Sequence, residues 1–319
     1  MHHLGCVMLM VWLFTSLASA GPRVGILRFG GRQPTTLHRA IQQAVPEAQV
    51  VFISGDDFAS GRLPQEPSVL VIPDAHQLPA MLGAPLQAWV RAKKGVLFVS
   101  DAVPLQRWLY RVGTRWVGRQ EALLALASWR PLWQGQPPSD SSWRRTTNEP
   151  QIDTSWSRVD TPHGIGWRIT VPKLTGWCTY NIQMEQPFHV GETLMTFWAK
   201  GDANTRALSI EWQEQDGSRW VATVPLSTSW QQFVLSPDDF AYWHDNPSQG
   251  RGGQGDHLNP QNAVGLSIGL AYSFASYPAN TRLEATLAGV RIGKLMQTLP
   301  IPPPFSLEGI APAYKFYAD

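Results

Sequence analysis

The side chains best suited to chemistry lie between Tyr242 and His257, where aromatic, donor and acceptor groups follow one another closely. The run Tyr242-Trp243-His244-Asp245-Asn246 is followed by Arg251 and a glycine-rich stretch. Flat rings can cover the apolar C–H faces of a sugar, while amide, carboxylate and guanidinium groups bind its hydroxyls. We therefore predict that this loop contacts a carbohydrate. The alternative is that its rings close one end of the domain core.

Other tryptophans divide between core and ligand contact. The chain has 15 tryptophans. Leu194-Thr196-Trp198 and Leu208-Ile210-Trp212 each alternate in phase, so both tryptophans are expected in the core. Trp177 follows a glycine and Trp220 follows the Asp216-Gly217 turn. These two rings are expected at strand ends and are candidate ligand contacts.

Two carboxylate pairs keep a catalytic alternative open. Hydrolysis of a glycosidic bond uses two carboxyl groups held about 5 to 9 Å apart. Glu211 with Glu214 and Asp238 with Asp239 are close in sequence. Neighbouring carboxylates on one strand rarely converge, and Pro237 before the second pair favours a turn. We therefore assign no catalytic residue.

Cysteine and metal chemistry are restricted by composition. The only cysteines are Cys6 and Cys178, and neither belongs to a cluster with the spacing of metal ligands. No cofactor is predicted, although a structural calcium ion held by carboxylates and backbone carbonyls stays possible. Because the chain has 26 basic and 24 acidic residues, its net charge is close to zero, and nucleic acid is not an expected partner.

The elements that position these groups belong to two expected domains. Short apolar strands alternate with helical stretches from Arg23 to Trp133, which predicts a parallel sheet covered by helices. The segment 134–160 is rich in Pro, Ser, Thr and Arg and is expected to be a linker. Segment 161–296 has short alternating strands, which predicts an all-β sandwich or jelly roll. On its last apolar strand Gly265, Ser267 and Gly269 share one face, which suits a close-packed neighbour or a shallow groove.

The first domain resembles class I glutamine-amidotransferase-like domains over Val69–His76 and Leu86–Ser100. Such domains have a flavodoxin-like parallel sheet, and active members carry a cysteine after the strand that corresponds to Val96–Val99. Here that turn reads Ser100-Asp101-Ala102, so cysteine-dependent amidotransferase or peptidase activity is excluded. A serine nucleophile at Ser100 would need a histidine base, and a role for His76 is less expected than a plain loop position.

The second domain resembles the galactose-binding-like jelly rolls that accompany carbohydrate-active enzymes. The resemblance rests on Gly176-Trp177, Leu194–Asp202, Ile210–Trp220, Trp230–Leu235 and Asp239–Asn246. It implies a glycan-binding module more than any particular ligand. Both resemblances together point to proteins associated with secreted glycoside hydrolases.

The first twenty residues are expected to be a signal peptide. An apolar run from Val7 to Leu17 precedes Ala18-Ser19-Ala20, although the start carries no Lys or Arg. We therefore expect a secreted or periplasmic protein without membrane insertion after cleavage. The expected organisation is 1–20 signal, 21–133 α/β domain, 134–160 linker, 161–296 β-sandwich and 297–319 proline-rich spacer and tail.

The leading hypothesis is an exported, non-catalytic carbohydrate-binding protein whose α/β domain serves assembly or docking. One alternative is a glycoside hydrolase or its accessory subunit. Another is a structural module of an envelope assembly, with the tail Ile310–Tyr317 docking on a partner protein or a second copy. The glycan, the oligomeric state and the choice between periplasm and medium are not determined by the sequence.

Overall fold

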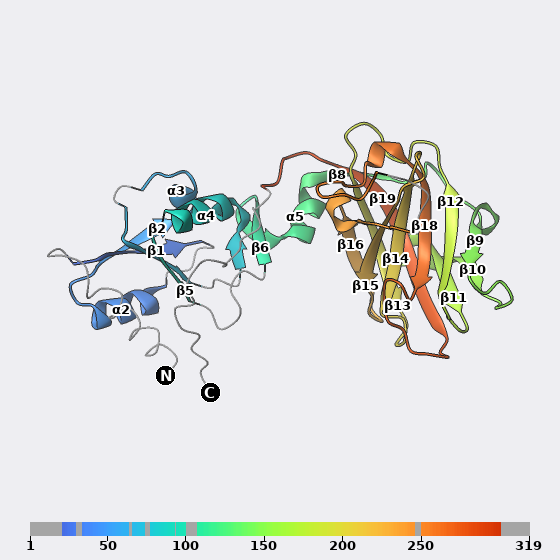
Figure 1. Cartoon of the computed structure of the whole chain (residues 1–319), viewed down its shortest axis with the longest axis horizontal. Coiled ribbons are helices and arrows are strands. Elements are labelled where there is room, and N and C mark those ends of the chain that lie inside the picture. The colour runs from blue at the N-terminus through green and yellow to red at the C-terminus, as the bar shows by residue number, and fades with distance from the viewer. Residues whose placement is uncertain are drawn as a thin grey trace. The chain divides into compact units, whose positions relative to one another are not determined.

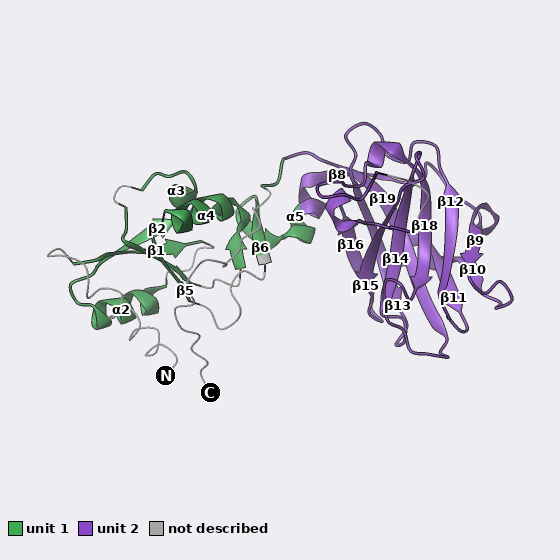
Figure 2. Ribbon diagram, viewed as in Figure 1, with its two compact units in different colours: residues 1–122, 298–319 green, residues 123–297 purple. Residues whose placement is uncertain are grey.

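A computed structural model describes residues 21–29, 34–63, 66–73, 77–92, 94–99, 107–245 and 250–300. The chain forms two compact units, one of residues 1–122 with 298–319 and one of residues 123–297 (Figure 2). The sequence predicts this division at 133–134, about one short strand later. Within the described residues, no helix has the length and apolar character needed to span a membrane.

The first unit is built on a four-stranded sheet in the order β2-β1-β3-β5, with every pair parallel. The strands are β1 (Arg23–Arg28), β2 (Gln49–Ser54), β3 (Val69–Pro73) and β5 (Gly95–Val99). The helices are α2 (Thr35–Ala44), α3 (Gly55–Ala59) and α4 (Gly83–Arg91), and α2 lies on the opposite side of the sheet from α3 and α4 (Figure 1). Apolar strands are buried on both faces because helices cover both.

Two buried clusters, one on each face, hold this sheet together. Val24 and Ile26 pack with Ile41 of α2, whereas Leu27 packs with Leu86 and Trp89 of α4. A parallel sheet covered by helices was expected here. The finer flavodoxin-like or amidotransferase-like assignment stays a prediction.

A small second sheet completes this unit. It contains β4 (Gln77–Pro79), β6 (Arg107–Val112) and β7 (Arg115–Gly118), and the short helix η1 (Ala80–Leu82) follows β4. Leu299 packs against its cluster around Tyr110 and Val117. The chain therefore leaves this unit near residue 122 and contributes to its core again after residue 298.

The second unit is a β-sandwich of two antiparallel six-stranded sheets. One sheet has the order β10-β11-β19-β13-β16, with β8 also paired to β19, and the other has the order β17-β15-β14-β18-β12-β9. The first sheet contains β8 (Ala127–Pro131), β10 (Ser155–Thr161), β11 (Gly164–Val171), β13 (Leu194–Gly201), β16 (Gln231–Leu235) and β19 (Leu283–Leu295). The second contains β9 (Arg144–Thr147), β12 (Trp177–Gln183), β14 (Ala207–Glu214), β15 (Arg219–Pro225), β17 (Ala241–Tyr242) and β18 (Ala263–Ala271). The remaining elements are α5 (Arg119–Leu126), η2 (Asp140–Ser142), η3 (Pro237–Asp239) and η4 (Pro260–Asn262).

One continuous core fills the space between the two sheets. It joins Trp167 and Ile169 of one sheet to Ile210, Trp212 and Ile268 of the other, all almost fully buried. The expected β-sandwich is therefore observed, with Trp212 in its core as predicted.

The segment expected to be a linker contributes to this sandwich instead. Residues 134–160 contain β9, which pairs with β12, and most of β10, which pairs with β11. The Arg and Thr side chains of β9 hide the strand from a search for apolar alternation, because β9 is an edge strand with exposed positions. Helix α5 ends at Leu126, since the following residues pair with β19 as β8.

The predicted phase of β13 is wrong by one residue. Met195, Phe197 and Ala199 face the core, whereas Trp198 lies on the outer side of the sheet. There the Trp198 ring stacks on His163, with centroids 3.9 Å apart. Nearly every residue of this strand is apolar or small, so alternation alone fits either phase.

Candidate functional site

The outer face of the β9-containing sheet carries a row of polar and aromatic side chains. In β12, Cys178, Tyr180 and Ile182 belong to the core, so Thr179, Asn181 and Gln183 point to the opposite face. In β14, Ile210 and Trp212 are in the core, which places Glu211 and Gln213 on that outer face. Period-two alternation therefore brings groups from different strands side by side.

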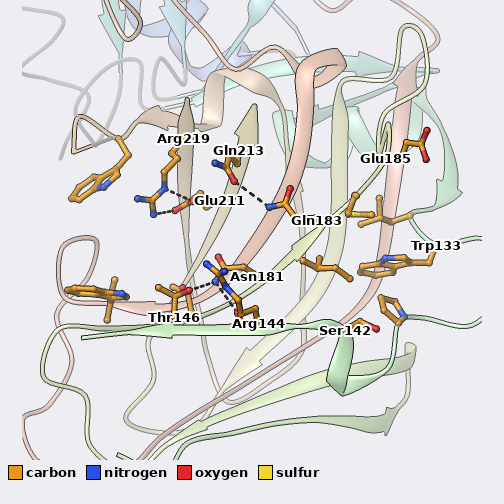
Figure 3. Close-up of a pocket in the computed structure, with 18 of the residues that line it drawn as sticks. Trp133, Ser142, Arg144, Thr146, Asn181, Gln183, Glu185, Glu211, Gln213 and Arg219 are labelled. Carbon is orange, nitrogen blue, oxygen red and sulfur yellow. Dashed lines mark hydrogen bonds and ion pairs between the residues drawn. The ribbon is translucent and has the colours of Figure 1, made fainter. Parts of the chain in front are cut away.

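A groove of about 1170 Å³ runs across this face. It is lined by β9, β12, β14 and β15 and by the segments that follow β8, β17 and β18. Figure 3 shows Arg219, Glu211, Gln213 and Gln183 along one side, Arg144, Thr146 and Asn181 along the other, and Trp133 toward one end. All of these residues belong to the second compact unit.

The small residues of β18 let the neighbouring strands meet over it. Gly265 pairs with Gln183 on one side and with Gln213 on the other, and the Gln183 amide reaches the Gln213 oxygen at 3.5 Å. At Gly269, a Cβ atom would overlap the carbonyl of Cys178 and the Cα of Thr179. The close-packed alternative for this glycine row is therefore the one observed, and the groove is lined by the flanking strands.

The polar groups of the groove are held in fixed positions. Arg219 donates from Nε and Nη2 to the two Glu211 oxygens, both at 2.8 Å. These hydrogen bonds raise the pKa of Arg219, and the opposite charges of the two side chains offset each other. The Asn181 amide donates to Thr146 Oγ1 at 2.9 Å and to the Arg144 carbonyl at 3.1 Å. A rigid polar surface with little net charge results.

Aromatic rings lie at both ends of the groove. Trp177 has 44% of its surface exposed, and Trp243 packs edge-on against Phe274 with centroids 4.9 Å apart. The backbone N–H of Trp243 donates to the Arg219 carbonyl at 2.8 Å, which ties this ring to β15. At the other end Trp133 rests edge-on against Trp167 at 4.7 Å.

Three of the predicted ligand contacts lie in the groove, namely Trp177, Trp243 and Asp245. Trp220 is only 2% exposed and belongs to the core, so the prediction that its ring meets a ligand is corrected. The strand carries it inward because Arg219 takes the outward position. Asn246 lies outside the described residues.

The other predicted contacts, Tyr242, His244 and Arg251, do not line the groove. The Tyr242 ring packs edge-on between Trp220 and His244, at 5.3 and 5.2 Å. Arg251 is turned toward the bend between β14 and β15, where it bonds Glu214 and Asp216. Its guanidinium is thus occupied by protein carboxylates.

The sequence analysis does not identify most of the polar groove residues. Gln213 is the outward neighbour of Trp212, which was correctly expected in the core, so the period-two pattern could have identified it. Asn181, Gln183 and Arg219 adjoin core residues that were not predicted as core, so the pattern gave no reference point for them. Arg144 and Thr146 were hidden within the expected linker.

The two carboxylate pairs considered for catalysis do not converge. A register shift separates Gln213 from Glu214, so Glu211 faces Arg219 in the groove while Glu214 is buried against Arg251. Asp239 accepts the Ser236 backbone N–H at 2.7 Å and caps η3, which is the expected turn. Among the described residues, no group of three or more His, Cys, Asp or Glu side chains is placed to hold a metal ion.

Several sequence predictions fall on residues that the structure does not describe. These are the signal peptide, the segments with His76 and Ser100, and the tail after residue 300. They stay predictions.

No protein-family model matches the chain, and no curated protein matches it significantly. Among solved structures, similarity is found to a family 11 carbohydrate-binding module from Clostridium thermocellum in complex with a β-1,3-1,4-mixed-linked tetrasaccharide. The identity is 13%, with 54% of this chain and 98% of that chain covered, and the TM-score is 0.42. A family 30 carbohydrate-binding module of a C. thermocellum cellulosomal cellulase matches at 12% identity, covering 52% of this chain and 98% of that chain, with a TM-score of 0.36.

An exo-β-agarase matches at 12% identity, with 52% of this chain and 25% of the agarase covered and a TM-score of 0.35. The similar solved structures thus include carbohydrate-binding modules and cover about half of this chain. Similarity at this level does not identify a ligand for the groove.

Proposed function

We propose that this protein is an exported, non-catalytic carbohydrate-binding protein that holds a glycan chain in the groove of its β-sandwich. The observation that carries the proposal is the exposed ring of Trp177 beside a fixed row of amide, hydroxyl and paired ionic groups. An exposed tryptophan in a polar groove costs solvation free energy that a sugar ring would recover.

The chemistry of the groove suits an uncharged sugar. The amides of Gln183 and Gln213 each offer a donor and an acceptor, and Asn181 offers its side-chain oxygen as an acceptor, which matches the dual character of a sugar hydroxyl. Arg219 and Glu211 compensate each other's charge, so neither sign dominates the middle of the groove. Because these side chains bond one another, little side-chain entropy is lost when a ligand arrives.

The length of the hollow supports binding of a polymer. A second depression of about 500 Å³ shares Gln183, Met184 and Glu185 with the groove and continues to Gln186 and Gln215. A surface of this extent accommodates several sugar units of one chain, which favours a polysaccharide over a monosaccharide.

A non-catalytic role is supported by the contacts of the acidic side chains. Glu211 is committed to Arg219 in the groove, and Glu214 is turned away from it. Export and an assembly or docking role for the α/β unit belong to the same proposal. They rest on the apolar N-terminal run and on the absence of a cysteine from the amidotransferase-like segment.

The test is affinity electrophoresis of the full chain through gels that contain a panel of neutral and acidic polysaccharides, followed by calorimetry. Retardation by neutral polymers without release of reducing ends is expected. Failure of every polymer to retard the protein would reject the binding proposal, and new reducing ends would reject its non-catalytic part.

A further inference from the structure

Arg251 bonds three carboxylates of the sandwich at once. Nε and Nη2 donate to the two Asp256 oxygens at 2.9 and 3.2 Å, while Nη1 and Nη2 donate to the two Glu214 oxygens at 3.1 and 3.3 Å. Nη1 also donates to Asp216 at 2.8 Å. The Arg251 side chain is 22% exposed and that of Glu214 is fully buried.

Three carboxylates would repel one another without this guanidinium. Hydrogen bonds from Arg251 and from the Gly252 backbone N–H lower the pKa of Asp256. Burial opposes ionisation of Asp216, but bonds from Ser218 and Arg251 outweigh it and lower its pKa. Around neutral pH Asp216 and Asp256 are therefore carboxylates bound to one guanidinium, which also bonds Glu214 and the His257 carbonyl.

This centre lies directly behind the groove wall. The guanidinium sits over the Trp220 ring at 5.4 Å, and that ring contacts the Tyr242 ring edge-on at 5.3 Å. Gly252, next to Arg251, approaches Tyr242 so closely that a Cβ atom there would overlap the Tyr242 ring. Tyr242 precedes Trp243, so contacts run from Arg251 to a ring that lines the groove.

We infer that Arg251 is a positioning residue for the groove: by binding Glu214, Asp216 and Asp256 it holds Trp220 and Tyr242 in place, and thereby fixes Trp243 and Asp245 in the groove wall. The inference rests on the proposed function. It replaces the sequence-based expectation that Arg251 itself touches the glycan.

Pre-organisation explains why these contacts of Arg251 affect the affinity for a glycan. A wall segment that is ordered before binding does not lose its conformational freedom when the glycan arrives. Lysine cannot substitute for arginine here, because one ammonium group does not provide the planar fork that bonds two carboxylates at once.

The test compares R251K and R251A with R130A in the full chain. Arg130 is a matched control: it is 23% exposed, lies in the same sandwich and makes a bidentate pair with Glu192. Amide hydrogen exchange is measured for residues 242–245 and 250–257 without ligand, and the dissociation constant is measured with a polysaccharide that binds the wild type.

We expect both Arg251 variants to exchange faster in these two segments and to bind about tenfold more weakly, whereas R130A loses thermal stability but keeps wild-type exchange there and wild-type affinity. If R251A fails to fold, R251K carries the test. Wild-type protection and affinity in R251K overturn the inference, as does an equal loss of affinity in R130A. Because the exchange measurement needs no glycan, it tests the positioning role of Arg251 even if the wild type binds no polysaccharide and the proposed function fails.

Discussion

Replacing Trp177 with alanine gives the most direct test of the groove. A tryptophan side chain offers at most about 250 Å² of surface, so an exposed fraction of 44% corresponds to about 110 Å². A sugar stacked on one face would cover about half of this area. At about 25 cal/mol per Å² the lost contact is about 1.4 kcal/mol, which raises the dissociation constant about tenfold.

The same change should leave the fold almost unaffected. The Trp177 ring lies at a strand end and on the solvent side of β12, so we expect the free energy of unfolding to fall by less than about 1 kcal/mol. Tyr272→Ala is the matched control, because Tyr272 is 36% exposed in the same unit but does not line the groove. The assay is isothermal calorimetry with the best polysaccharide, combined with urea denaturation of each variant.

A folded Trp177→Ala protein that binds as tightly as the wild type would exclude a contact between this ring and the glycan. Equal weakening of binding by Tyr272→Ala would exclude it too, because the effect would then not be specific to the groove.

Further experiments test the glycines of β18, the Arg219–Glu211 ion pair and the pH dependence of binding. Gly265→Val should push apart the glutamines that meet over this glycine and weaken binding in calorimetry with the fold retained, whereas Gly269→Ala should lower the melting temperature, because its Cβ overlaps backbone atoms. Glu211→Gln should lower the free energy of unfolding in urea by about 1 kcal/mol, a value reduced because the Arg219 side chain is 37% exposed. The pKa of Asp256 is lower in the folded state than its ordinary value of 3.8, so ionisation of Asp256 stabilises the fold at any pH above 3.8. This stabilisation is lost as the pH falls through the folded-state pKa. Affinity measured by fluorescence titration should therefore stay level from about pH 8 to 5 and fall below about pH 4; a steep loss near pH 6 would contradict this assignment.

The accuracy with which the sequence predicts each strand depends on how regularly apolar and polar residues alternate in it. The parallel strands and the β14 core positions follow from apolar runs and from period two, and Trp212 lies where that pattern puts it. In β13 both faces carry apolar or small residues. There, tertiary contacts decide the phase, including the stacking of His163 on Trp198.

The groove was only partly predictable for a different physical reason. Trp177 and Trp243 were recognised because exposed aromatic residues near turns are unusual, but Trp220 has the same local signature and lies in the core. Arg251 has the donors expected of a sugar contact, and only the fold reveals that three carboxylates use them, two of which are distant in sequence. Local composition reports which groups are present, whereas the register of the sheets decides what each group meets.

The pairing of β8 with β19 has a mechanical consequence. Ala127 lies opposite Leu295, so the chain enters and leaves the sandwich at the same end of two adjacent strands. Tension applied through these two connections pulls β8 and β19 in the same direction and does not peel one from the other. It is resisted by β11 and β13, which hydrogen-bond β19 along much of its length and must slide past it for the sandwich to open. A pull on both connections would thus load many hydrogen bonds in shear at once.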